Sequence, residues 1–220
     1  MRLPGIVTVN PADRSLIKRL ATMMGDSFME EQWTCEVLSV LPDNSDRKRE
    51  VSRTIILASM TGVAPADGCY TLNDSSALAL AYLKSELGDT TWSQLEKRGA
   101  HVLEAALSAE ELTAIEKQEQ RMEAVSVFNW EYEAAHEMGF DDFIHFVCLA
   151  VDTQARGSGS FRHLITPFFD YADAHNIPCF LETYSDKLEA LYRHVGFQTI
   201  RTFCDPAFDI VERGMVRMPG

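Results

Sequence analysis

The sequence lacks the cysteine pattern of a disulfide-stabilised or zinc-binding protein. It has 220 residues and no Cys-x-x-Cys pair. An odd number at wide spacing argues against a disulfide framework, and several cysteines lie within apolar runs, so we expect buried, reduced thiols. A reducing cytoplasm is then the expected compartment. The five cysteines are Cys35, Cys69, Cys148, Cys179 and Cys204.

Basic residues and long apolar runs are also scarce. There are 20 Lys and Arg against 33 Asp and Glu, which gives a formal net charge of −13. A nucleic-acid-binding protein needs a basic face, so we expect no nucleic acid partner. No run is apolar enough over the length of a bilayer and no signal peptide is evident, so we expect no membrane partner. The acidic balance suits a cationic amine substrate, and it suits solubility alone.

Repeats, low-complexity tracts and metal-ligand spacings are absent as well. His163 and His175 lie twelve residues apart on one predicted helix, which is not a ligand spacing, so we predict no metal site. The hydrophobic fraction is 46% and the charged fraction 24%. These values predict one globular domain over residues 1–220.

The most informative stretch is a glycine-containing loop between a predicted strand and a predicted helix. The run 143–151 is rich in β-branched and aromatic residues and predicts a strand buried on both faces. The loop 154–159 follows, and it is either a phosphate-binding loop or an ordinary tight turn in which Ser158 or Ser160 caps the next helix. Glycine lets the backbone approach an anion, and a helix start offers unpaired N–H groups, so the loop suits phosphate. The helix stripe is Phe161, Leu164, Ile165, Phe168, Phe169 and Ala172.

The N-terminal part predicts helices followed by a hairpin. A helix starting at Pro11 should end at Gly25, and Ser27 with Glu30 predicts a capping box for a second helix. A third helical stretch covers 47–61. The runs 69–72 and 77–83 predict two antiparallel strands joined by a short turn.

The region 88–138 predicts a helical insertion before the fourth strand. It has no strand pattern, and Thr91 with Gln94 and Ser108 with Glu111 are capping boxes. Its last part, which includes Phe128 and His136, is also predicted to be helical. Such an insertion between two sheet strands would form a lid or side wall.

Strands and helices alternate after the loop. The run 179–183 predicts a strand, Ser185 and Asp186 begin a short helix, and 197–200 and 215–218 predict the last strands. The fold class is therefore α/β (α+β), with a mixed, mostly antiparallel twisted sheet covered by helices on both faces. The exposed edge of the C-terminal strand would allow a homodimer.

Two motifs in this half resemble those of the GNAT acetyltransferase superfamily. Gln154-x-x-Gly157-x-Gly159 is similar to the Arg/Gln-x-x-Gly-x-Gly/Ala loop that binds acetyl-CoA. Downstream, Leu191-Tyr192-x-x-x-Gly196-Phe197 is similar to the family's Leu-Tyr-x-x-x-Gly-Phe motif. The resemblance covers about residues 143–200. The segments 133–136 and 180–185 also resemble the puromycin N-acetyltransferase-like branch.

The resemblance implies a set of residues that bind acetyl-CoA. Backbone groups at the end of the fourth strand would bind the pantetheine arm, and loop N–H groups would bind the pyrophosphate. Arg156 could add charge, and Ser185 stands where many members have asparagine. The implied set is Leu149, Ala150, Val151, Gln154, Arg156, Gly157, Ser158, Gly159, Ser160 and Ser185.

The resemblance also implies catalytic roles. Tyr192 occupies the family's general-acid position and would protonate the leaving thiolate. Glu182 is an acid in an otherwise apolar strand, so it is either the general base or a structural acid. His145 is a second acid–base candidate, or a core residue, and His136 could line the acceptor pocket. A water chain from Glu182 would serve equally well.

The predicted function is acetyl transfer from acetyl-CoA to the primary amine of a small molecule, by direct attack through a tetrahedral intermediate. One alternative is a protein or peptide N-acetyltransferase, which a wide, flat acceptor groove would favour. Another is a non-catalytic acyl-CoA-binding domain. Nucleotide binding by a phosphate loop is excluded, because no Gly-Lys-Ser/Thr follows the glycines.

Overall fold

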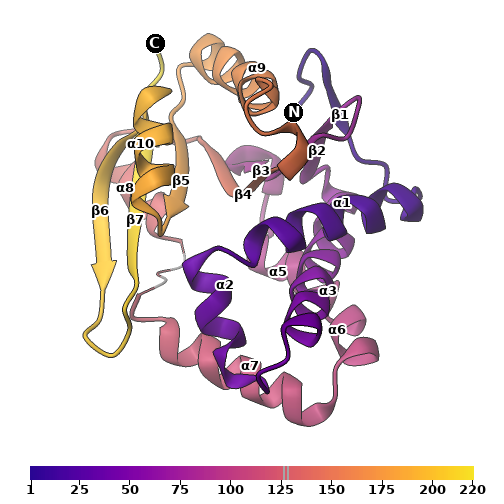
Figure 1. Ribbon diagram of the computed structural model, residues 1–220. Helices are drawn as coiled ribbons and strands as arrows, with labels where there is room; N and C mark the ends of the chain where they lie inside the picture. Colours follow the sequence, from indigo (N-terminus) through magenta and orange to yellow (C-terminus); the bar gives the residue numbers. More distant parts are fainter. Residues whose placement is uncertain (126, 128) are drawn as a thin grey trace.

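The computed structural model describes residues 1–220 except Ser126 and Phe128, so the prediction for Phe128 lies outside the described residues. The strands form one sheet of seven in the order β1-β2-β3-β4-β5-β7-β6 (Figure 1). Only β4 and β5 pair in parallel, so the predicted mixed, mostly antiparallel sheet is confirmed. The strands are β1 Ile6–Thr8, β2 Cys69–Leu72, β3 Ala77–Leu83, β4 Ile144–Val151, β5 Cys179–Thr183, β6 Gln198–Cys204 and β7 Val211–Arg217.

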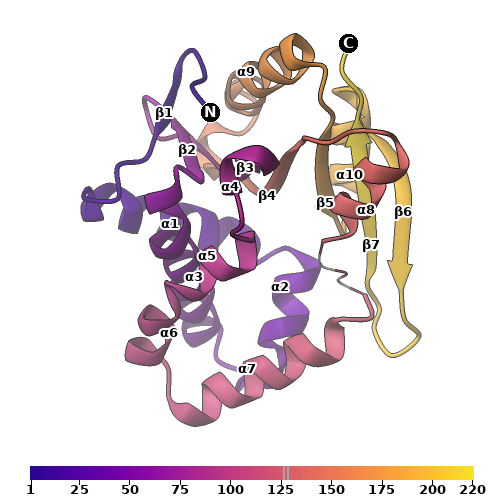
Figure 2. The same ribbon diagram turned by 180° about the vertical axis from the view of Figure 1, so that it is seen from behind.

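Helices cover both faces of this sheet, as predicted. Residues of α1, α3, α5 and α8 share one hydrophobic core with the sheet, and residues of α9 and α10 share the other (Figure 2). The helices are α1 Arg14–Phe28, α2 Gln32–Val37, α3 Ser45–Val63, α4 Lys84–Leu87, α5 Trp92–Lys97, α6 Ala100–Ala106, α7 Ala109–Met122, α8 Trp130–Glu137, α9 Ser160–His175 and α10 Asp186–His194. Among the described helices, none combines the length and hydropathy needed to cross a bilayer.

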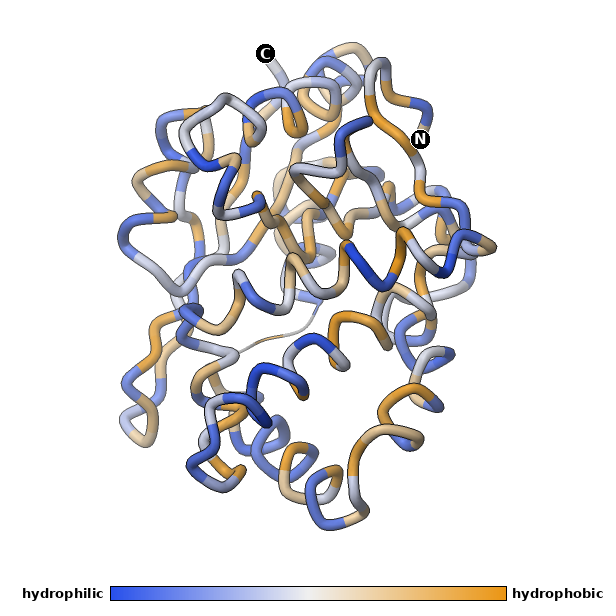
Figure 3. The backbone as a smooth tube through the Cα atoms, turned by 45° about the vertical axis from the view of Figure 1, so that its right-hand side comes forward, coloured by the Kyte–Doolittle hydropathy of each residue, from blue (hydrophilic) through white to orange (hydrophobic). Residues whose placement is uncertain are grey.

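The strand β3 shows why the sheet has two cores. All seven of its residues are buried. Successive side chains of a strand point to opposite faces, so Leu78, Leu80 and Tyr82 enter the core with α1 and α3, while the intervening residues enter the core with α9. Figure 3 shows hydrophobic residues concentrated along the central strands, while the helices alternate between hydrophobic and hydrophilic residues.

The strands β4 and β5 pair only at their beginnings and then diverge. The paired residues are Ile144–Phe146 and Cys179–Leu181, although β4 continues to Val151 (Figure 1). A register shift opposite Leu80 and Ala81 marks a bulge in the β3–β4 ladder at this point. The prediction of a strand buried on both faces therefore holds for the first part of β4 and is wrong for residues 147–149, which are half-buried. They have lost the neighbouring strand on one side.

The predicted helix end at Gly25 is wrong, because α1 continues to Phe28. A Cβ at position 25 would lie 2.6 Å from the Cα of Arg53 in α3. Glycine is therefore present because α1 and α3 pack closely there, and its usual role as a helix terminator does not apply.

The predicted capping box at Ser27 is also wrong. Ser27 lies inside α1, where its hydroxyl donates to the carbonyl of Met23. The N-cap of α2 is instead Glu31, whose carboxylate accepts from the N–H groups of Trp33 and Thr34. Glu31 caps α2 in place of the expected serine because α1 extends to Phe28 and includes Ser27.

The region 88–138 contains the expected helices. Both predicted capping boxes, Thr91 with Gln94 and Ser108 with Glu111, are present. Residues of α7 form a third core with α2, with the segment after it and with Ile210 in the turn between β6 and β7. The insertion therefore reaches from α3 to the C-terminal hairpin (Figure 1).

One ion pair connects α7 of this insertion to α3. The guanidinium of Arg47 donates to both carboxylate oxygens of Glu111, at 2.8 and 2.6 Å, and their side chains are 26% and 19% exposed. This contact, with the N–H of Ser108, lowers the pKa of Glu111 to about 2. A carboxyl group with a lowered pKa stabilises the fold above its unfolded pKa, and that contribution is lost as the pH falls toward 2.

We therefore expect Glu111→Gln to destabilise the protein. The bidentate, partly exposed pair should contribute about 1–2 kcal/mol, which corresponds to a decrease in Tm of roughly 2–8 °C at neutral pH. Thermal unfolding measures this directly, with the exposed Glu104→Gln of α6 as the control. The difference between wild type and Glu111→Gln should shrink as the pH is lowered from 5 toward 2; a constant difference would exclude the ion pair as the cause.

The last two strands are longer than predicted. β6 and β7 pair from Gln198 with Val216 to Cys204 with Val211, so the hairpin takes in residues that look polar in isolation. Among the cysteines, Cys69 and Cys179 are buried as expected, whereas Cys35 and Cys204 are exposed. All five are free thiols in the described structure.

Candidate active site

The glycine loop ends at the first turn of α9. Its N-cap is Gly159, with φ of +93°, and Gly157 has φ of +83°. Side chains rarely adopt this left-handed region, which explains both glycines. The alternative of a turn capped by Ser158 or Ser160 is wrong: none of the described side chains caps α9, and the hydroxyl of Ser158 donates to the carbonyl of Ala155. The first N–H groups of α9 therefore have no partner within the helix and are available to an anion.

The loop has room for a phosphate group. A Cβ added to Gly157 would meet no atom within 4 Å. Asp152 fixes the start of the loop by accepting from the N–H of Gln154. Ser160 is buried and its hydroxyl lies 3.2 Å from that of Ser76 in the β2–β3 turn, so its side chain serves the fold. The open backbone and the helix start leave space and donors for a pyrophosphate, and its binding there stays a prediction.

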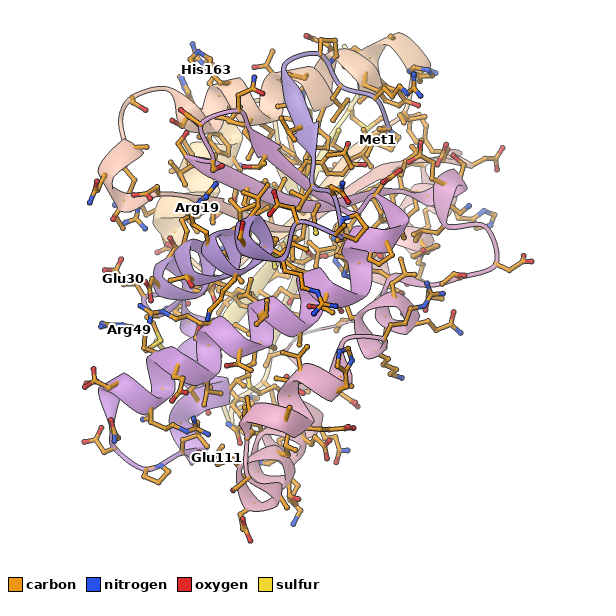
Figure 4. The ribbon with its side chains drawn as sticks, turned by 90° about the vertical axis from the view of Figure 1, so that its right-hand side faces the viewer. Met1, Arg19, Glu30, Arg49, Glu111 and His163 are labelled. Atoms are coloured by element: carbon orange, nitrogen blue, oxygen red, sulfur yellow. The ribbon has the colours of Figure 1, made fainter. Side chains whose placement is uncertain are left out.

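The side chain of Arg156 points toward Glu30. It is half exposed, and its Nη1 lies 3.8 Å from Glu30. Figure 4 shows Glu30 at the edge of the molecule, near the end of α1. A contact of this length between exposed groups is weak, so the arginine is free to turn.

The open part of β4 lies beside this loop. Leu149, Ala150 and Val151 pair with β3 on one edge, and the opposite edge is not paired with β5. Backbone groups on an unpaired edge need a partner. An extended, amide-containing chain such as pantetheine could pair with them in the same way as a strand.

Tyr192 lies on α10, across the opening from β4. Its side chain is buried, with the rings of Phe161 and Phe197 each 6.0 Å away. Burial, and then the nearby Cys148 and Glu31, raise the pKa of Tyr192. The hydroxyl therefore stays protonated at neutral pH, as a general acid requires.

Ser185 is the N-cap of α10, as predicted, and accepts from the N–H of Leu188. It lies at the end of β5 and so borders the same opening. The cap orients α10 and with it Tyr192. Its contact with the pantetheine arm stays a prediction.

Glu182 and His145 meet on the sheet face opposite α9. The imidazole Nε2 of His145 lies 2.9 Å from both carboxylate oxygens of Glu182. His145 is buried, whereas the Glu182 side chain is 18% exposed. Strand register causes this meeting, because His145 pairs with Phe180 and Glu182 is the next residue on that face of β5.

Three further side chains complete the group, and no sequence motif points to them. Trp130 and Glu131 occupy the first turn of α8. The indole N–H of Trp130 donates to Glu182, and Glu131 accepts from the hydroxyl of Tyr82 at 2.7 Å. A Cβ at Gly214 would lie 2.9 Å from the indole ring, so glycine in β7 lets Trp130 reach Glu182. His136 lies exposed near the end of α8, apart from the buried group.

The acids around His145 govern its charge. Burial lowers the pKa of His145, but Glu182 and Glu131 outweigh it and raise the pKa to about 9. Glu131, His145 and Glu182 lie within 4.8 Å of one another. The two imidazole nitrogens face different carboxylates, which is the arrangement of a hydrogen-bonded chain and not of a cation site.

Acidic side chains of the α2 cap and of the helical insertion 88–138 also lie near the open part of β4. Burial raises the pKa of Glu31 in the α2 cap and of Glu119 in α7, each to about 7, and also raises that of Glu96 in α5. Burial raises the pKa of Cys148 in β4, with further contributions from Glu96, Glu31 and Glu182. Acids from α5, from the N-cap of α2 and from β5 therefore lie near Cys148 of β4.

Comparison with known proteins finds this fold in solved structures of acetyltransferases. No protein-family model matches the chain, and no curated protein matches its sequence. The structure is similar to arylalkylamine N-acetyltransferase 2 from Aedes aegypti, with a TM-score of 0.58, 15% identity and 98% of each chain covered. It is similar to an N-acetyltransferase from Staphylococcus aureus, with a TM-score of 0.57, 18% identity, and 96% of this chain and 98% of that chain covered.

A third similar structure is the polyamine N-acetyltransferase of Drosophila melanogaster, described as forming N-acetylagmatine. Its TM-score is 0.53 and its identity 14%, with 97% of this chain and 98% of that chain covered. The puromycin-like branch stays a prediction. At these identities the shared feature is the fold, and it extends over nearly the whole chain: the protein has the fold of the GNAT superfamily of N-acetyltransferases.

Proposed function

We propose that the protein transfers an acetyl group from acetyl-CoA to the primary amine of a small, cationic molecule. The single observation that supports this most is the divergence of β4 from β5, with the glycine loop at one end of the opening and Tyr192 beside it. Tyr192 and Phe161 of the first turn of α9 belong to the core on one face of the sheet. Glu182 borders the opening from β5.

Acetyl-CoA would be bound mainly by backbone groups. N–H groups of residues 156–160 would hold the pyrophosphate at the start of α9, and Leu149 to Val151 would pair with the pantetheine arm. The side chains of Gln154 and Arg156 are exposed and would add contacts at the rim. Ser158 and Ser185 shape the two ends of this path.

The chemistry needs one base and one acid. The ammonium group of the substrate loses a proton to Glu182, directly or through a water, and the neutral nitrogen attacks the thioester carbonyl. The nitrogen of the tetrahedral intermediate loses its second proton to a water molecule, and the intermediate collapses to the amide with cleavage of the C–S bond. The thiolate takes the proton of the Tyr192 hydroxyl. Tyr192 takes up a new proton from solvent after the products leave.

The acidic wall supports a cationic acceptor. Glu31 and Glu96 add negative charge near the opening, and a bound ammonium group would favour their ionised forms. The helix α7 packs on both α2 and the β6–β7 turn. In this proposal, α7 therefore spans the side of the opening where the amine would enter. A bridged site favours a small molecule over a protein chain as the acceptor.

Acetyl-CoA binding and turnover are measured separately. At one hundred times its Kd, acetyl-CoA should stabilise the protein by about 2.7 kcal/mol, which is roughly 5–10 °C in Tm. A panel of monoamines, diamines and peptides, followed by CoA release, should show turnover on small amines, with diamines favoured. Binding without turnover on any amine would support an acyl-CoA-binding domain, and preference for peptides would support a protein acetyltransferase.

A matched pair of glycine substitutions tests the loop. Gly157 and Gly139 both have positive φ and open space where a Cβ would stand, so Asp strains the backbone equally at either position. Gly157→Asp should abolish most of the stabilisation by acetyl-CoA, because it adds negative charge beside the pyrophosphate. Gly139→Asp should leave it intact. Equal loss in both would remove the loop from the binding site.

A further inference from the structure

A continuous chain of polar contacts runs under the proposed site through four elements. It begins at Glu131 in α8, which accepts from Tyr82 in β3 at 2.7 Å. The Tyr82 oxygen lies 3.1 Å from Nδ1 of His145, and Nε2 of His145 lies 2.9 Å from Glu182. Glu131 and His145 are nearly inaccessible, at 2% and 7% exposure, so water cannot readily replace these partners.

With Glu131 and Glu182 both ionised, counting hydrogen-bond donors gives the protonation of this chain. An ionised carboxylate only accepts, and a tyrosine hydroxyl has one proton. Tyr82 gives its proton to Glu131, so its oxygen must accept from Nδ1 of His145. Glu182 must accept from Nε2. Both imidazole nitrogens therefore carry a proton, and His145 is an imidazolium between two carboxylates.

The surroundings of His145 agree with this charge. The titratable groups that face it are Tyr82 of β3, Glu131 of α8, Glu182 of β5 and, with a weaker effect, Glu212 of β7. No described cation is among them, so His145 supplies the positive charge of the group. The Oε2 atom of Glu131 is buried without a hydrogen-bond partner in the described structure. The negative charge of Glu131 is therefore stabilised by Tyr82 and His145.

We propose that Glu131 and Tyr82 are positioning residues that set the proton affinity of His145, and that the base of the transfer is the His145–Glu182 pair and not Glu182 alone. This inference rests on the proposed function. In the accepting state His145 is neutral at Nε2. The substrate N–H bond breaks, its proton passes through Glu182 to Nε2, and Glu182 is again a carboxylate. The proton later returns to solvent, and no electrons are gained or lost.

The protonation of His145 can be measured without substrate. In ¹⁵N-histidine-labelled protein, with His145→Gln to assign the signal, both ring nitrogens of His145 should be protonated at pH 7 and should titrate at about pH 9. Glu131→Gln keeps an oxygen that accepts from Tyr82 but removes the charge. It should lower this titration point by about 1–3 pH units, the range for loss of an adjacent opposite charge. Glu133→Gln, an exposed acid on the same helix, should leave it unchanged.

Activity gives the second measurement. With one amine as substrate, the pH of half-maximal kcat should fall in Glu131→Gln by the same amount as the His145 titration point, because the amine's own pKa is unchanged. A wild-type His145 that is neutral at pH 7, or that titrates identically in Glu131→Gln, would overturn the inference. If Glu131→Gln does not fold, Tyr82→Phe must lower the titration point instead. A His145 that titrates as expected in a protein without transferase activity would refute the proposed function and leave the charge network standing.

Discussion

Tyr192→Phe should reduce kcat for amine acetylation about 10²–10⁴-fold, the usual contribution of a general acid. The substitution removes one oxygen and keeps the ring between Phe161 and Phe197, so packing is preserved. Because the pKa of Tyr192 is raised by burial, the wild-type hydroxyl is a full-strength donor throughout the neutral range. Steady-state CoA release measures the loss.

The interpretation depends on acetyl-CoA binding being retained. Stabilisation by acetyl-CoA should differ little between Tyr192→Phe and wild type, because backbone groups provide most of the proposed contacts. Tyr171→Phe is the matched control, since Tyr171 is a half-buried tyrosine of α9 that stacks on His175 at 3.9 Å, away from the opening. If Tyr192→Phe turned over at the wild-type rate, the thiolate would have to take its proton from another group.

Glu182→Gln should also reduce kcat at pH 7 by about 10²–10⁴-fold, because the amide cannot accept the amine proton. Gln has the shape of Glu and can still accept from Trp130, so the local fold should persist. The loss should shrink at high pH, where the substrate amine is already neutral in solution. Rates from pH 7 to 10 with one amine measure this trend.

The pH trend separates a base from a structural acid. If Glu182 only supported the fold, its substitution would reduce the rate by a similar factor at every pH. A constant factor, together with a lowered Tm, would therefore assign Glu182 to structure. A shrinking factor with an unchanged Tm would support the base.

Much of the fold could be predicted because its signals are local. The hairpin of β2 and β3 was predicted with its observed bounds, since alternating apolar runs around a polar turn are a short-range pattern. The capping boxes at Thr91 and Ser108 were likewise confirmed. Gly25 misled for the opposite reason: its role is a close approach to Arg53 of another helix, and no local pattern contains that contact.

In the candidate site, too, some residues belong to local sequence motifs and others are brought in by long-range contacts. The glycine loop and Tyr192 belong to motifs that can be read from neighbouring residues, and the fold places them beside one opening. Trp130, Glu131 and Tyr82 carry no such pattern. They could be recognised only once α8 had been placed on the sheet.

The sequence by itself determined the loop at Gly157 and Gly159, the helix after it and the order of strands, because backbone conformation and hydrophobic periodicity depend on nearby residues. Only the tertiary structure decided how His145 is charged. Its partners stand 63 residues away at Tyr82 and 37 residues away at Glu182. They meet it because strand register aligns β3, β4 and β5 and because Gly214 leaves room for the first turn of α8. Proton affinity in a buried site depends on which charges are adjacent in space, and chain order does not specify that.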